Sequence, residues 1–164
     1  MQHISTSIKF ASVKIGISVA LFIVSLSYAT ASHAQKAKTV NVDKKGLALK
    51  GYDPVAYFKD HKAVKGNAKY KLRHGAAVWY FASDEHRQAF KSNPGKYKPR
   101  YGGYCAWAMS QGKLADIDPK AWKIHAGKLY LNYNKAIQRK WEKNMKAFIR
   151  DADEKWPKVQ AGKE

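Results

Sequence analysis

Cys105 is the residue whose type and position most clearly allow chemistry. It is the chain's single cysteine, and it follows a Gly-Gly pair at the expected start of a short buried helix over residues 104–111. The unpaired amides and positive end of a helix stabilise a thiolate and lower its pKa. A thiolate attacks disulfides, reacts with oxidants and binds soft metals such as copper(I) or zinc. The sequence therefore makes Cys105 the candidate catalytic residue, as a redox thiol.

The alternative is that Cys105 is a small buried hydrophobic residue between Tyr104 and Trp107. Free cysteine is among the residue types most often found in protein cores. A chain with one cysteine cannot form an internal disulfide, so a redox cycle would need an external thiol or a partner protein. The residues alone leave both interpretations open.

Histidines are the other candidate ligands for a soft metal. Those beyond residue 34 are His61, His74, His86 and His125. No two of them lie four positions apart on an expected helix, so there is no local metal-binding motif. We expect His86 on the exposed to intermediate part of its helix, within reach of a site that the fold builds. Candidate metal ligands are thus Cys105, His86 and His125, for copper or zinc.

The elements that would position these residues are short and alternate between strands and helices. The segments 65–73 and 76–82 are predicted to be two strands joined at His74-Gly75, and the second of them is the apolar one. Ser83 is a natural cap for a helix that runs to about residue 92. A second hairpin is expected at 122–133. We expect Asp116 and Asp118 to be turn residues before Pro119.

The C-terminal segment predicts one amphipathic helix. Asn134 can cap it, Pro157 is expected to end it, and its apolar residues recur at spacings of three and four: Ile137, Trp141, Met145, Phe148 and Ala152. Local strand pairs interrupted by helices indicate the α+β class, with a small antiparallel sheet, a few short helices and a longer C-terminal helix.

The N-terminal segment has the pattern of a secretory signal peptide. A basic start precedes an apolar stretch at 15–26 and then small residues up to Ala34. The apolar stretch is too short for a membrane-spanning helix, which needs about 20 residues. We expect cleavage after Ala34, with Ala31 as the alternative, and a periplasmic or secreted protein that does not span the membrane. The predicted parts are a signal peptide (1–34), a polar lead-in (35–50), one domain (51–157) and a C-terminal tail (158–164).

The charge is strongly positive and spread along the chain. The full sequence carries +19, and cleavage after Ala34 removes two lysines and no acid, which leaves +17. Such a charge draws a protein toward anionic surfaces. For an exported protein we expect anionic envelope components, such as lipid, lipopolysaccharide or wall polymers, rather than nucleic acid; a solvated basic surface with no partner is the alternative.

Several motifs together resemble the YHS domain family, in its exported single-domain branch. They are GYDPVAYF, KGNAKYKLRHGAAVWYFAS, FKSNPGKYKPRYGGYCA and GKLYLNYN, in this order over residues 51–157. Metal-linked members of the family carry cysteines after the DPV motif and in an FCSxxC motif. The matching positions here are Ala56, Ala82 and His86, so the usual thiolate set is missing. Some relatives carry selenocysteine at the position of Cys105, which implies a reactive thiol there.

Three functions are compatible with these residues. The first is redox chemistry at Cys105 with a periplasmic thiol or redox partner, and the second is metal-ion binding. The third is a non-catalytic interaction domain that binds anionic envelope components through its basic surface. No general base is recognisable beside the thiol, so the residues leave open whether Cys105 acts in catalysis or only in binding.

Overall fold

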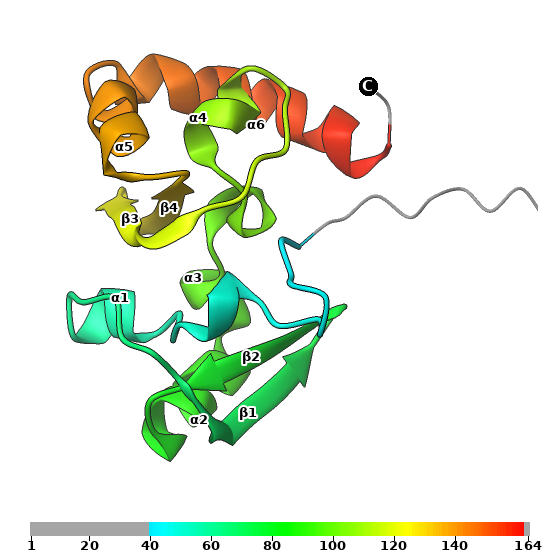
Figure 1. Ribbon diagram of the computed structural model, residues 1–164, viewed down its shortest axis with the longest axis vertical. Coiled ribbons are helices and arrows are strands. Elements are labelled where there is room, and N and C mark those ends of the chain that lie inside the picture. The colour runs from blue at the N-terminus through cyan, green and yellow to red at the C-terminus, as the bar shows by residue number, and fades with distance from the viewer. Residues whose placement is uncertain (1–39, 163–164) are drawn as a thin grey trace, which may run out of the picture. The chain divides into compact units, whose positions relative to one another are not determined.

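Two β-hairpins and a set of mostly short helices make up the part of the chain that the structure describes, residues 40–162 of a computed structural model (Figure 1). All of these residues belong to one folded unit. The predicted signal peptide lies outside the described residues. The predicted α+β class is confirmed, with the strands arranged as two separate antiparallel pairs, β1–β2 and β3–β4.

The first half of the described chain is built around the β1–β2 hairpin. Its elements are η1 (Leu49–Gly51), α1 (Ala56–Lys59), β1 (Asn67–His74), β2 (Ala77–Phe81), α2 (Asp84–Ser92) and α3 (Pro94–Tyr97). Strand β2 alternates strictly, so that Ala77, Trp79 and Phe81 are buried while Val78 and Tyr80 are half-buried on the opposite face. Helix α2 covers the buried face, where the ring of Phe90 lies 5.1 Å from that of Trp79.

The predicted hairpin and the predicted start of α2 are confirmed in this half. The hairpin turns at Gly75, which has a φ of +60°, and the two strands pair in antiparallel register. The Ser83 side chain accepts a hydrogen bond from the backbone N–H of His86 at 3.2 Å and caps α2 as expected. Such a cap satisfies one of the amides that the first turn of a helix leaves unpaired.

The second half is built around the β3–β4 hairpin. Its elements are η2 (Arg100–Gly103), α4 (Ala106–Ser110), β3 (Asp118–His125), β4 (Lys128–Asn132), α5 (Lys135–Glu142) and α6 (Met145–Gln160). Figure 1 shows α5 and α6 on the same side of this hairpin as α4. No helix within residues 40–162 is long and apolar enough to cross a membrane.

The C-terminal helix differs from the prediction in two ways. It is interrupted after Glu142, because Asn144 has non-helical backbone angles and starts α6 anew. Pro157 lies inside α6 and does not end it, so that prediction is wrong. The last turn persists because Val159 is buried against the rest of the domain, and therefore the helix extends into the predicted tail.

Two hydrophobic clusters form the core, and β4 contributes to both. Leu129 and Leu131 point into the larger cluster, which contains the β1–β2 hairpin, whereas Tyr130 points into the smaller one under α6. Successive side chains of a strand point to opposite faces. Because both faces of β4 are covered, this short strand couples the two halves of the domain.

The described part of the lead-in is packed into the domain. Ala48 and Leu49 are buried, and Leu47 pairs with Val78 of β2 as an isolated parallel bridge. The predicted polar lead-in (35–50) thus contains an apolar LAL stretch whose Ala48 and Leu49 supply core contacts despite their lysine neighbours.

Candidate functional site

Cys105 lies directly before α4, after the left-handed turn at Gly102 and Gly103, as the sequence predicts. Its backbone N–H bonds to the carbonyl of Ala115 at 3.0 Å, and its side chain is part of the larger core cluster. Only 1% of the residue is exposed. The position at a helix start is therefore confirmed, but the thiol is enclosed by protein.

The thiol has one polar neighbour, Asn132 at the end of β4. The Cys105 Sγ lies 3.8 Å from Asn132 Oδ1, which also accepts the backbone N–H of Trp107 at 3.3 Å. Asn132 is fully buried, and its Nδ2 has no hydrogen-bond partner among the described residues. The pair can hold a neutral thiol as a donor to the amide oxygen. Reaction with a solute would require the surrounding core to open.

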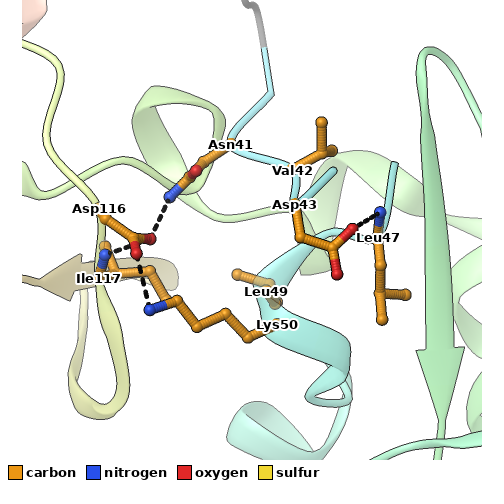
Figure 2. A pocket seen from close by; sticks show the side chains of 8 residues that line it. All are labelled: Asn41, Val42, Asp43, Leu47, Leu49, Lys50, Asp116 and Ile117. Carbon is orange, nitrogen blue, oxygen red and sulfur yellow. Dashed lines mark hydrogen bonds and ion pairs between the residues drawn. The ribbon is translucent and has the colours of Figure 1, made fainter. Parts of the chain in front are cut away.

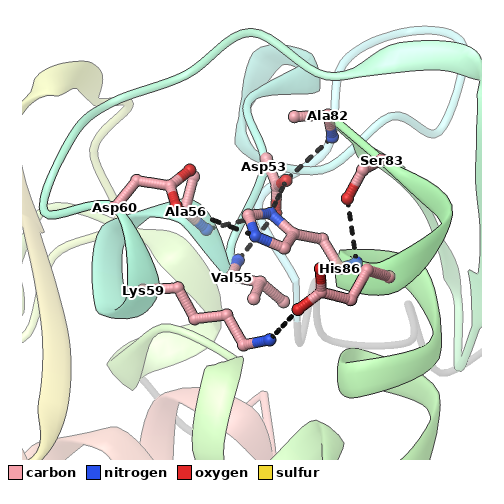
Figure 3. A network of polar contacts seen from close by, with 9 residues as sticks. Asp53, Val55, Ala56, Lys59, Asp60, Ala82, Ser83 and His86 are labelled. Carbon is pink, nitrogen blue, oxygen red and sulfur yellow. Dashed lines mark hydrogen bonds and ion pairs between the residues drawn. The ribbon is translucent and has the colours of Figure 1, made fainter.

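His86 occupies a different place and is buried, so the expectation of an exposed to intermediate position is wrong. It is 8% exposed, and its Nδ1 lies 2.7 Å from Oδ2 of Asp53 (Figure 3). The reason is Asp53, a fully buried carboxylate in the DPV motif that draws the imidazole inward. A buried carboxylate is tolerated when it is hydrogen-bonded and paired.

The carboxylate of Asp53 is saturated with donors. Its Oδ1 accepts the backbone N–H groups of Val55 at 2.7 Å and Ala56 at 3.3 Å, and its Oδ2 accepts that of Ala82 at 2.8 Å as well as contacting His86. Asp53 thus joins the DPV turn, the end of β2 and helix α2. The positions that the family resemblance assigns to cysteines, Ala56 and Ala82, meet here together with His86.

The surroundings of this network do not complete a metal site. His86 Nε2 lies 3.8 Å from Oδ1 of Asp60, and Lys59 forms an ion pair with Glu85 at 2.6 Å. Within residues 40–162, no three His, Cys, Asp or Glu side chains are grouped so that they could hold a metal ion. Cys105, His86 and His125 therefore form no such group, and the copper or zinc interpretation lacks a donor set that fits.

His125 ends β3 at the turn of the second hairpin, where it pairs in register with Lys128. It is partly exposed.

A small hollow of about 150 Å³ lies between the lead-in and the segment before β3 (Figure 2). Asp116 accepts hydrogen bonds there from Asn41 Nδ2 at 3.2 Å and from the backbone of Ile117 at 2.8 Å, and pairs with Lys50 at 2.7 Å. Burial acts to raise the pKa of Asp116, but the hydrogen bonds from Lys50, Ile117 and Asn41 outweigh it and hold that pKa below its ordinary value. These contacts attach the lead-in to the domain.

The outward face of the first hairpin carries a surface hollow that we call the basic face. It is a hollow of about 420 Å³ lined by Lys45, Leu47, Lys71, Arg73, Val78 and Tyr80. The register places Lys71 opposite Tyr80 and Arg73 opposite Val78, so that cations from β1 flank an apolar and aromatic floor. Within the described residues, none of its three cations forms an ion pair with a carboxylate.

Sequence reasoning missed both Asp53 and the basic face. A signal for the face is present: in KYKLR, basic residues alternate along a strand at 69, 71 and 73, and alternate residues share one face. Asp53 lies in the DPV motif, but only the fold places it beside His86.

Comparisons with family models, curated proteins and solved structures found no match for this chain. The functional argument therefore depends on the residues themselves.

Proposed function

We propose that this chain is an exported, YHS-like, non-catalytic domain that binds the anionic lipid surface of the cell envelope through its basic face. The observation that carries the proposal is the grouping of Lys45, Lys71 and Arg73, free of carboxylate partners in the described structure, around an apolar floor. The predicted signal peptide would deliver the domain to this surface.

The chemistry of the basic face suits a phosphate-bearing amphiphile. Lysine and arginine donate hydrogen bonds to phosphate oxygens without competition from neighbouring carboxylates. Leu47, Val78 and the ring of Tyr80 offer apolar surface to the boundary between headgroup and chain, where aromatic residues with a polar tip are favoured.

The family part of the proposal has one supporting observation. Ala56, Ala82 and His86 are 30 positions apart or less in the sequence, and they meet at Asp53 where the resemblance places a shared site. Because two of these positions are alanines, the usual metal chemistry of the family is not part of the proposal.

Redox chemistry at Cys105 remains a second candidate. The observation in its favour is the thiol's place at the start of α4 beside a buried amide that lacks a partner for its Nδ2. The burial of the thiol places it second, because an attacking thiolate needs access to its substrate.

Vesicle co-sedimentation tests the lipid proposal. Mature protein starting at residue 35 would be mixed with vesicles of phosphatidylcholine alone or with phosphatidylglycerol added, over a series of salt concentrations. Each cation near an anionic surface contributes about 1 kcal/mol. Three such contributions together correspond to an affinity change of about 100-fold. The triple variant Lys45→Gln/Lys71→Gln/Arg73→Gln should therefore bind the vesicles at least ~10-fold more weakly, even if each contribution is smaller than this.

A matched control separates the basic face from total charge. Lys91→Gln/Lys128→Gln/Lys146→Gln removes the same charge from exposed positions outside the face. We expect the affinity of this control for the vesicles to fall less than about threefold, because distant charges are screened by salt and attract the surface only weakly. Equal losses in both triple variants would show that only net charge matters, and binding independent of salt or of phosphatidylglycerol would refute the proposal.

A further inference from the structure

A second cavity, of about 250 Å³, lies between the first hairpin and the last helix. Its walls come from β2, the segment 98–102 and α6, and they include Trp79, Lys98, Arg100, Tyr101, Trp156 and Gln160. None of the residues that line it is acidic. It is separate from the basic face, with which it shares no lining residue.

Three aromatic residues are among those that line the cavity: Trp156 is half-buried, whereas Trp79 and Tyr101 are 2% exposed. The rings of Tyr101 and Trp156 are 6.2 Å apart in an edge-to-face arrangement, and Trp79 contributes from the opposite element, β2. Such walls favour a planar or apolar ligand, because aromatic pairs gain from stacked and edge-to-face contacts.

Two cations add a preference for negative charge. Lys98 is exposed and forms no ion pair within the described residues. Arg100 pairs with Asp153 through Nη2, but its Nε is buried without an acceptor in the described structure. Its guanidinium also lies 5.4 Å from the ring of Tyr101. The positive charge at this wall is therefore only partly compensated.

The backbone at the cavity is held in an unfavourable conformation. Tyr101 has a φ of +53°, and Gly102 and Gly103 continue the left-handed turn at +60° and +82°. A bulky residue in this region is strained, and such strain clusters at ligand-binding sites. The tyrosine is fixed by hydrogen bonds from its hydroxyl to Asp153 at 3.0 Å and to the carbonyl of Ile149 at 3.3 Å.

From these observations we propose that the cavity is a binding site for a small aromatic carboxylate. The ring would lie against the half-buried Trp156, with Trp79 behind the opposite wall, and the carboxylate would face Lys98 and Arg100. A volume near 250 Å³ fits one ring with a short side chain, since pockets for drug-sized ligands start at about 300 Å³.

Titration followed by amide and indole N–H spectra in NMR tests this site. The probes are benzoate, phenylacetate and trans-cinnamate, with cinnamamide as the neutral counterpart of cinnamate. We expect saturable shifts of the indole signals of Trp79 and Trp156 and of the amide of Gly102 with at least one carboxylate, and weaker shifts with cinnamamide.

Charge-matched variants localise the effect. Lys98→Gln should weaken carboxylate binding by about twofold to fivefold, consistent with one exposed charge. Lys91→Gln on α2 and Lys71→Gln on the basic face should leave it unchanged. Absence of saturable shifts at Trp79 and Trp156 with all three carboxylates, equal binding of cinnamamide, or equal effects of Lys98→Gln and Lys91→Gln would overturn the proposal.

Discussion

The Oδ2 of Asp53 lies 2.7 Å from the Nδ1 of His86, although 33 positions separate the two residues in the chain. Asp53 also accepts three backbone N–H groups, from Val55, Ala56 and Ala82. This single carboxylate therefore ties a turn, a strand end and a helix together in the buried part of the first half.

Replacing Asp53 with alanine should lower the free energy of unfolding by about 3–5 kcal/mol, the usual cost of removing one partner from a buried polar pair. The loss arises because three backbone donors and an imidazole are left without their acceptor. Urea denaturation followed by tryptophan fluorescence measures it. As a control, Glu154→Gln alters an exposed residue outside the network and should change stability by less than about 0.5 kcal/mol. A loss for Asp53→Ala no larger than for Glu154→Gln would contradict the network in Figure 3.

The burial of Cys105 predicts slow alkylation of the native protein. Because 1% of the residue is exposed, the reagent must await an opening of the core, and the rate should be at least ~100-fold below that in urea. An accessible reference is Lys113→Cys in a Cys105→Ser background, since residue 113 is exposed. Native Cys105 reacting as fast as Cys at this reference position would refute the burial and move redox chemistry ahead of lipid binding.

Tyr57 and Tyr101 should resist ionisation until the protein unfolds in alkali. Burial is the main cause that raises the pKa of both hydroxyls, and for Tyr101 the charge of Asp153 adds to it. The folded-state pKa lies above the unfolded value of about 10. Their contribution to stability is therefore complete below pH 10 and falls as the pH rises further, where the unfolded state alone ionises.

A titration of phenolate absorbance, run beside circular dichroism, tests the tyrosine prediction. Removing either hydroxyl by Tyr57→Phe or Tyr101→Phe should reduce only the absorbance change that accompanies unfolding. If either substitution instead removed signal from the part of the titration that precedes unfolding, that tyrosine would be accessible in the folded state.

Gly66 lets the two strands of the first hairpin approach each other at the edge of the basic face. A Cβ at this position would lie 2.5 Å from the backbone carbon of Tyr80 and 2.7 Å from its Cβ. Gly66→Ala should therefore destabilise the protein by roughly 1–3 kcal/mol through overpacking and weaken lipid binding by displacing Tyr80. Gly95→Ala is the control, because its nearest contact would be an ordinary 3.7 Å. Equal urea midpoints for the two variants would rule out this close approach.

The contribution of Asp116 to stability should be lost in acid. Its pKa is lowered in the folded protein, where the bonds from Lys50, Ile117 and Asn41 outweigh the opposing effect of burial. The contribution is present above the unfolded value of 3.8 and is lost as the pH falls through the lower folded value. Melting temperatures below about pH 4 should decline less steeply for Asp116→Asn than for the natural sequence or for Glu154→Gln. Parallel declines in all three would contradict the attachment in Figure 2.

Local patterns in the sequence were sufficient for most elements of the fold. The apolar run AVWYF predicted β2, Ser83 predicted the start of α2, and Asn134 predicted the start of α5, where its side chain accepts the N–H of Ile137 at 2.9 Å. These predictions held because side-chain periodicity and helix capping depend on residues a few positions apart. The same patterns placed Cys105 directly before a short helix.

Tertiary contacts decided what local patterns could not. Pro157 was expected to end the last helix, but burial of Val159 holds a further turn in place. His86 was expected near the surface, and the buried carboxylate of Asp53 draws it inward. In both cases the contact that decides the outcome is made with a part of the chain distant in sequence. The periodicity of residues within a short segment therefore cannot predict it.

The sequence by itself determined the α+β class, the strongly basic composition and the position of its only thiol at a helix start. The tertiary structure alone decided that this thiol is enclosed, that His86 is bound to Asp53, and that Lys45 joins Lys71 and Arg73 around Tyr80. The physical reason is that accessibility, and the grouping of charges from separate segments, depend on how the chain packs, whereas residue type and spacing set only which groups are present.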